Sequence, residues 1–320
     1  MMRYERKVAL LSGVLALLLA IWGAGELFSP ERLAARAESK RLIAGQPGDV
    51  AALDIGIEPG KLSLVKEDDS WLLVEGGAKL PAQASRVGSF LDAVSAVRRL
   101  RPVGKSKDAW KGLDLEEGKA KPVLVRDAKG RALADFAVGG YGPTGAEVFV
   151  RLAGSEASYA VDTGIASYVA SDRRSWLDLR VVPGPLPESD VEAVAVRASI
   201  ALDGAGKPPL VVDYALRRDK EGWSGVAGAD PVAVSALVRS ALNLEGEDIV
   251  AAPPASAFSP VSARVELSLG NGGSKVLEVG APAGEGRFYL RLAGNPQVYA
   301  VSAYGLRNIL RRPAELVARK

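Results

Sequence analysis

An internal repeat places the strongest restriction on how this chain can fold. The segments Arg151-Leu152-Ala153-Gly154 and Tyr159-Ala160-Val161 recur, with 140 added to each residue number, as Arg291-Leu292-Ala293-Gly294 and Tyr299-Ala300-Val301. Self-similarity over such a distance indicates two copies of one structural unit. Features present in both copies are therefore interpreted first as scaffold and only then as site.

Each copy also contains the pattern of an amphipathic helix. Five apolar residues recur at helical spacing, and the second set lies 147 residues after the first. They are Val87, Phe90, Leu91, Val94 and Val97 in the first copy, and Val234, Leu237, Val238, Ala241 and Leu244 in the second. In the second copy, Asp230-Pro231 offers an N-cap and a first-turn proline.

Short runs typical of strands surround each helix, without the regular alternation of a doubly wound sheet. This pattern predicts an α+β fold, in which each copy is a mainly antiparallel sheet packed with one longer and one short helix. Three prolines in Pro183–Pro187 predict a stiff linker between the copies. The predicted parts are 1–29 (cytoplasmic tail and transmembrane anchor), 30–45 (juxtamembrane stalk), 46–182 (first repeat domain), 183–187 (linker) and 188–320 (second repeat domain).

The N-terminus has the pattern of a membrane anchor. Eighteen residues from Val8 to Gly25 carry no charge and follow a basic cluster. As a helix they would span about 27 Å, close to the roughly 30 Å of a bilayer core. The charge order predicts a single-pass protein of the cytoplasmic (inner) membrane, with the N-terminus in the cytoplasm and both repeat domains periplasmic or otherwise extracytoplasmic.

Two alternatives to an anchor are considered for this segment. Small residues at Gly23-Ala24-Gly25 would suit a cleaved secretory signal peptide, and a buried soluble helix is the third interpretation. The uncleaved anchor is preferred because the apolar run is longer than a usual signal core.

The composition of the chain excludes several kinds of catalytic and metal-binding site. The chain has no cysteine and no histidine, which excludes disulfides, thiol nucleophiles and the commonest general base and metal ligand. The net charge of +3 is small and dispersed, so no nucleic-acid partner is expected. No cofactor, no metal site and no catalytic residue is predicted.

The motifs that could carry chemistry have simpler interpretations. The glycine-rich stretch Gly139–Gly145 leads into a strand instead of opening a helix, so it is interpreted as a hairpin connection and not as a phosphate loop. Acidic groups that could act in pairs all lie in polar turns. They are Asp68-Asp69, Asp114 with Glu116-Glu117, and Glu245 with Glu247-Asp248.

Four residues are the candidates for ligand binding. An arginine beside an aromatic residue on a strand face, as at Arg151 and Arg291, can bind a carboxylate or phosphate. The alternative is that the arginine stem covers the neighbouring ring. Trp110 and Trp176 are less tied to the repeat than Trp71 and Trp223, which are interpreted as core anchors. The candidates are Arg151, Arg291, Trp110 and Trp176.

The chain resembles the bacterial family known as domain of unknown function 4340 (DUF4340). The resemblance rests on the anchor, the two copies, the tryptophan after a charged turn, the Trp110-Lys111-Gly112-Leu113 loop and the Tyr159-Ala160-Val161 strand, and it covers Lys40 to the C-terminus. The second copy departs from it, with Phe258-Ser259-Pro260-Val261 in place of the tryptophan loop. The resemblance implies a membrane-anchored extracytoplasmic protein, of a family often encoded beside components of an ABC-type transporter similar to the gliding-motility export system.

These observations lead to a non-enzymatic binding or assembly component, anchored in the membrane and partnering transporter or envelope proteins. Two other functions stay open. One is a carboxylate-dependent envelope hydrolase, which needs two acids converging in a cleft. The other is a carbohydrate-binding module that uses Trp110 or Trp176.

Overall fold

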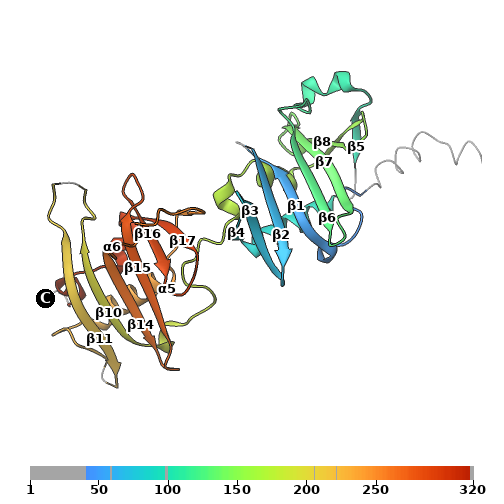
Figure 1. The fold of residues 1–320 in the computed structure, drawn as a ribbon. Coiled ribbons are helices and arrows are strands. Elements are labelled where there is room, and N and C mark those ends of the chain that lie inside the picture. The colour runs from blue at the N-terminus through green and yellow to red at the C-terminus, as the bar shows by residue number, and fades with distance from the viewer. Residues whose placement is uncertain (1–40, 58–59, 98–99, 205, 221, 318–320) are drawn as a thin grey trace, which may run out of the picture. The chain divides into compact units, whose positions relative to one another are not determined.

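The computed structural model describes residues 41–57, 60–97, 100–204, 206–220 and 222–317 (Figure 1). The predicted anchor, Val8–Gly25, lies outside these residues. Among the helices that are described, none has the length and apolar character needed to cross a membrane. Leu42 and Ile43 are buried, and the Ala44 amide donates to the Leu133 carbonyl, so the end of the predicted stalk packs on the first sheet.

The protein is an α+β chain with two antiparallel sheets. The first sheet has nine strands in the order β4-β3-β2-β1-β6-β7-β8-β9-β5. These strands are β1 (Val50–Gly56), β2 (Lys61–Glu67), β3 (Ser70–Glu75), β4 (Ala78–Pro81), β5 (Arg101–Gly104), β6 (Lys121–Asp127), β7 (Ala132–Tyr141), β8 (Glu147–Leu152) and β9 (Ser158–Asp162).

The second sheet has eight strands in the order β12-β11-β10-β14-β15-β16-β17-β13. They are β10 (Val191–Ile200), β11 (Leu210–Asp219), β12 (Gly222–Ser224), β13 (Asp248–Ile249), β14 (Ala263–Leu269), β15 (Ser274–Pro282), β16 (Arg287–Leu292) and β17 (Val298–Ser302). The two orders are the same when β10 is matched to β1 and β14 to β6, except that no strand among the described residues of the second sheet is equivalent to β4.

By their contacts, the residues form two compact units. One unit is Met1–Asp69 with Ser85–Asp172, and the other is Ser70–Ala84 with Arg173–Lys320. Strands β3 and β4 thus belong to the first sheet and are grouped with the second unit.

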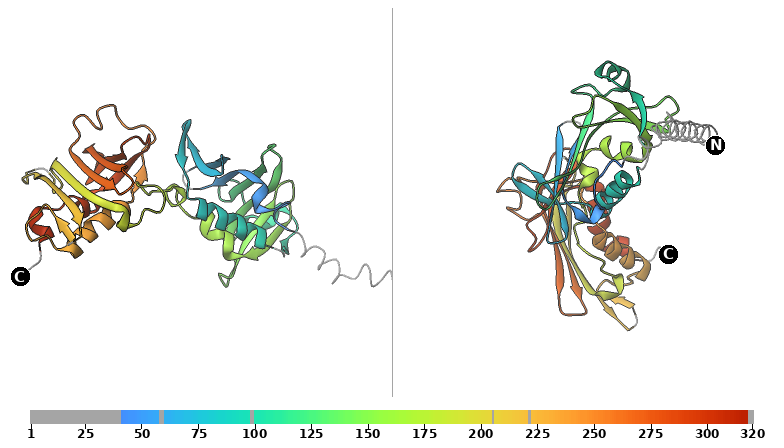
Figure 2. Two further views of the ribbon diagram at one scale, coloured as in Figure 1. Left: turned by 90° about the horizontal axis from the view of Figure 1, so that it is seen from below. Right: turned by 90° about the vertical axis from the view of Figure 1, so that its right-hand side faces the viewer.

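One long and one short helix accompany each sheet and cover one of its faces (Figure 2). The helices α3 (Ala84–Ala96) and α4 (Ala166–Val169) accompany the first sheet, and α5 (Pro231–Leu242) and α6 (Ala303–Ile309) accompany the second. In the first pair, the rings of Phe90 and Tyr168 meet edge to face with centroids 5.4 Å apart.

The apolar stripes of the long helices form the core, as their spacing predicts. All five predicted residues of each stripe are buried, although Val97 and Leu244 lie just beyond the last helical turn. Helix α5 begins as predicted, because the Asp230 carboxylate accepts a hydrogen bond from the Val232 amide at 3.0 Å. Side chains of this size contribute about 1.5–3 kcal/mol each when fully buried, so the stripes attach the helices to the sheets.

Candidate functional site

A loop in the first copy crosses β7 at very short distance. It contains two 3-10 turns, Lys107–Ala109 and Lys111–Leu113. A Cβ atom added to Gly139 would lie 2.3 Å from the Leu113 carbonyl oxygen, and one added to Gly140 would lie 2.7 Å from a carboxylate oxygen of Asp114. Only glycine allows the two backbones to approach so closely.

This contact corrects one boundary expected from the sequence. Gly139 and Gly140 are the end of strand β7, which continues to Tyr141, and are not the start of the hairpin connection. The turn itself runs through Gly142–Gly145. The second copy has the same arrangement, because a Cβ at Gly280 on β15 would lie 1.9 Å from the Ala257 carbonyl oxygen.

Two of the predicted site residues meet at this loop. The indole of Trp110 is half-buried, and its Nε1 donates to the Glu156 carbonyl at 3.0 Å. The guanidinium of Arg151, on β8, lies over the indole with Cζ 4.5 Å from the ring centroid. This is cation–π geometry, in which the ring fixes one face of the guanidinium and leaves its edge for hydrogen bonds.

Neither of the residues paired directly with Arg151 on the neighbouring strands is acidic. Pairing places Ala137 of β7 and Ser158 of β9 opposite Arg151, so the three side chains share one sheet face. The Nε of Arg151 and the Oγ of Ser158 are both buried without a hydrogen-bond partner. Within the part of the chain that the structure describes, no carboxylate forms an ion pair with Arg151.

The third predicted residue, Arg291, occupies the same place in the second sheet. Its Cζ lies 4.2 Å from the ring centroid of Phe258, the residue that replaces Trp110. Here the opposite residue on β15 is Glu278, whose carboxylate accepts from Arg291 Nε at 2.8 Å and lies 3.7 Å from Arg264. Opposite Arg291 on β17 stands Val298.

Trp176, the fourth predicted residue, is fully buried. It ends a 3-10 turn, Arg173–Trp176, and its carbonyl accepts from the Gln83 amide at 2.8 Å. Its indole therefore offers no surface to a ligand.

Of the acidic groups named from the sequence, Asp69 and Asp114 lie in turns as predicted, whereas Asp248 lies on strand β13, and these three pair with basic side chains. Asp69 has positive φ and lies 3.2 Å from Lys66, while Asp114 lies 3.4 Å from Lys119. Asp248 forms an ion pair with Arg173. Among the described residues, no group of three or more acidic side chains is placed to hold a metal ion.

One buried carboxylate was not singled out from the sequence. Asp54 interrupts the apolar strand β1, and its side chain is only 8% exposed. Burial alone would raise the pKa of Asp54, but the hydrogen bond from Ser63 and the charges of Lys61 and Arg126 outweigh it and hold the pKa below its ordinary value. Asp54 alternates with the core residues Leu53 and Ile55, so it lies on the opposite face of the sheet, where its partners come from β2 and β6.

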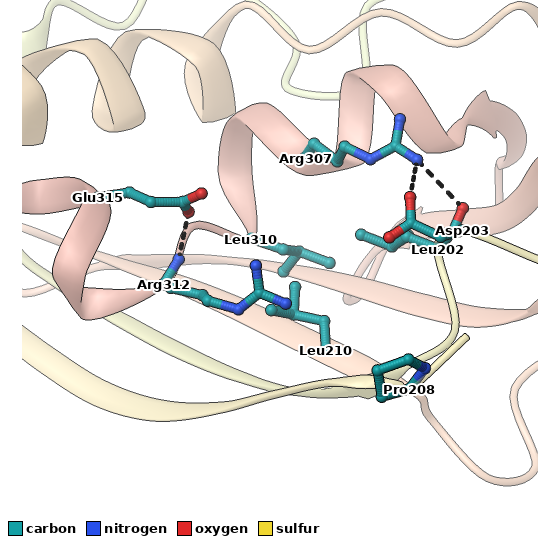
Figure 3. Close-up of a pocket in the computed structure, with 8 residues that line it drawn as sticks. All are labelled: Leu202, Asp203, Pro208, Leu210, Arg307, Leu310, Arg312 and Glu315. Carbon is teal, nitrogen blue, oxygen red and sulfur yellow. Dashed lines mark hydrogen bonds and ion pairs between the residues drawn. The ribbon is translucent and has the colours of Figure 1, made fainter.

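A hollow of about 90 Å³ in the second unit was also not visible from the sequence (Figure 3). Arg307 of α6 forms an ion pair with Asp203 at one side, and the Arg312 amide donates to the Glu315 carboxylate at 2.7 Å at the other. The ion pair Arg307–Asp203 joins residues 104 positions apart, so no local sequence pattern predicts it. Apolar residues complete the lining: Leu202, Pro208, Leu210 and Leu310.

Comparison with known proteins gives a family. The family model described as Domain of unknown function (DUF4340) matches residues 71–256 and 223–320. No match is found among curated proteins or among solved structures. The two matched ranges together cover most of the chain and both copies of the repeat, as the resemblance of the sequence implied. The chain therefore belongs to the DUF4340 family.

Proposed function

We propose that this chain is a non-enzymatic binding or assembly component, anchored in the cytoplasmic membrane, that presents two sheet domains outside the cytoplasm to a transporter or envelope protein. The anchor is supported by the uncharged run Val8–Gly25 behind a basic cluster. The partner class is supported by the family resemblance.

The observation that carries a binding role is the arginine–aromatic pair present at the same place on both sheets. Arg151 lies over Trp110 and Arg291 over Phe258, each at cation–π distance. On β8, the neighbouring Val148 and Val150 are fully buried, so by strand alternation Arg151 faces away from that core. Arginine and tryptophan dominate binding energy in protein interfaces, because both combine a large flat surface with directed hydrogen bonds.

A binding role also fits the state of the acidic groups. A hydrolase that uses two carboxylates needs them facing one another across a substrate. Asp69 and Asp114 instead lie in turns and pair with lysine, and Asp248 lies on β13 and pairs with Arg173.

Co-purification from native membranes tests this proposal. The tagged full-length protein is cross-linked in cells, extracted in mild detergent and compared with the double variant Trp110→Ala/Phe258→Ala, which removes both aromatic rings. We expect transporter or envelope proteins in the first eluate and a marked loss of them in the second. Recovery of the full-length protein with no envelope or transporter protein would contradict the proposal.

A further inference from the structure

The two sheets differ at one charge in otherwise equivalent sites. In the second sheet, Arg291 stacks on an aromatic ring and donates from Nε to Glu278 at 2.8 Å. In the first sheet, Arg151 stacks in the same way, but the residue opposite it on the preceding strand is Ala137. The second sheet thus has a carboxylate, that of Glu278, at the position where the first sheet has Ala137. The second sheet therefore shows which chemical group this arginine–aromatic site can bind.

The first site also holds two buried donors that nothing in the described chain satisfies. They are the Nε of Arg151 and the Oγ of Ser158, which faces Arg151 across the β8–β9 pair. In the second sheet the equivalent arginine Nε is bonded, and the serine is replaced by Val298, which needs no partner. A buried donor without an acceptor is unfavourable, so the first site favours an incoming acceptor with negative charge.

We propose that the first sheet binds a carboxylate from an acidic side chain of a peptide or protein partner. The guanidinium of Arg151 pairs with it, the Ser158 hydroxyl is the second donor, and the ring of Trp110 holds the guanidinium in orientation. The ligand carboxylate takes the role that Glu278 has in the second sheet. This inference rests on the proposed function in one respect, because it requires that the chain has a binding partner.

The chemistry of the site favours a carboxylate over a phosphate. The built-in anion of the second sheet is a glutamate, held by Arg291 and at 3.7 Å from Arg264. The first sheet has Arg151 and, at the position paired with Ala137 on β6, Pro122 in place of a second arginine. One arginine and one hydroxyl match a singly charged planar acceptor.

Binding of a defined peptide to the full-length protein in detergent tests the inference. The probe is a fluorescein-labelled peptide of alternating glycine and glutamate, and the same peptide with glutamine is the control. We expect one glutamate peptide per chain. Arg151→Gln should weaken binding about tenfold to hundredfold, the range for a hydrogen bond to a charged group. Arg197→Gln, at an exposed arginine outside both sites, should leave it unchanged.

Two further substitutions add a carboxylate to the first site or remove it from the second. Ala137→Glu gives the first sheet its own carboxylate and should abolish peptide binding. Glu278→Ala removes the built-in anion from the second sheet and should raise the stoichiometry from one peptide to two. Should Ala137→Glu fail to fold, the contrast between Arg151→Gln and Arg197→Gln decides the question.

Several results would overturn the inference: equal binding of the glutamine peptide, equal effects of the two arginine variants, undiminished binding by folded Ala137→Glu, or stronger competition by inorganic phosphate than by acetate at matched ionic strength. Absence of peptide binding together with retained co-purification would overturn this inference alone. Peptide binding that follows the expected variants, without any co-purified protein, would count against the proposed function alone.

Discussion

At the scale of single residues, Asp54 shows how an unfavourable burial is compensated by neighbours from other strands. Its carboxylate accepts from the Ser63 hydroxyl at 2.7 Å and lies 2.8 Å from Arg126 and 3.1 Å from Lys61. A buried carboxylate would be costly alone, but these partners favour its charged form. The charge therefore stabilises the first sheet across β1, β2 and β6.

Asp54→Asn should lower the free energy of unfolding by about 1–3 kcal/mol at pH 7, because the neutral amide removes the negative charge that pairs with Arg126 and Lys61. Urea unfolding of the full-length protein measures this. The matched control is Asp213→Asn, whose ion pair with Arg197 is exposed at both ends, and it should change stability by less than about 0.5 kcal/mol. Equal effects of the two substitutions would contradict the assignment.

The same carboxylate predicts a dependence of stability on pH. The pKa of Asp54 is lower in the folded chain than its ordinary value, so its contribution is present above the unfolded pKa of about 3.9 and is lost as pH falls through the folded pKa. Asp54→Asn should therefore lose less stability than the unmodified protein on acidification below about pH 4. Urea midpoints measured along that range test the sign, and parallel curves for the two proteins would be evidence against it.

At the scale of elements, glycine decides where a loop can cross a strand. Gly139 of β7 and Gly280 of β15 lie two residues before the ends of their strands, directly against a carbonyl oxygen of the crossing loop, although the two loops differ in sequence. In the first copy this crossing brings Trp110 to Arg151, so the glycine acts on the candidate site through the backbone.

Gly139→Ala should destabilise the fold by about 1–3 kcal/mol, because its Cβ would lie 2.3 Å from the Leu113 oxygen and the loop would have to move. The control is Gly112→Ala in the same loop, where a Cβ meets nothing within 4 Å. Thermal unfolding compares the two, and the tryptophan emission of Gly139→Ala should also shift as Trp110 leaves Arg151. If Gly139→Ala left the unfolding temperature unchanged, the loop would not be in close contact with β7.

Helix α3 offers the opposite case. Gly88 lies in its interior, and an added Cβ would meet nothing within 4 Å. Gly88→Ala should therefore stabilise the protein by about 0.5–1 kcal/mol, since alanine loses less backbone entropy in a helix. The expected result is a higher urea midpoint with an unchanged dependence of the free energy on urea concentration. A lower midpoint would show that the added methyl group clashes with a neighbour.

At the scale of the whole molecule, the proposed function requires the N-terminal segment to stay in the membrane. The sequence allows an uncleaved anchor or a cleaved signal peptide, and the two differ in the mature chain. The segment Val8–Gly25 is uncharged throughout, and a charge near its middle would be costly in a bilayer.

The full-length protein should remain in the membrane pellet after an alkaline carbonate wash, and mass spectrometry should recover its N-terminal peptide. Leu18→Arg should reduce the membrane fraction, because an arginine at the centre of a spanning helix costs about 2.5–3.5 kcal/mol. Leu27→Arg, beyond the apolar run, is the control and should leave the fraction unchanged. Loss of residues 1–25 from the mature protein would contradict the anchor.

Local periodicity was sufficient for much of the fold. The buried stripes of α3 and α5 and the cap at Asp230 lie where the sequence predicted, because each depends on residues within a few helical turns of one another. Boundaries failed where a distant segment intervened, as at Gly139, which stayed in β7 because a loop packs on it. The expected surface position of Trp176 rested on its weak tie to the repeat, which carries no information on burial.

The duplication, the helix faces and the family resemblance could all be read along the chain, since repetition and periodicity are properties of sequence order. The different roles of Arg151 and Arg291 could not be read along the chain. Arg151 and Arg291 stand in identical motifs, and only strand pairing sets Ala137 opposite one and Glu278 opposite the other. That pairing depends on the order of strands in each sheet, a non-local property that no window of sequence contains. This difference in strand pairing is the reason why Arg291 is paired with Glu278 within its own sheet, whereas Arg151 has no such carboxylate and is proposed to bind one from a partner.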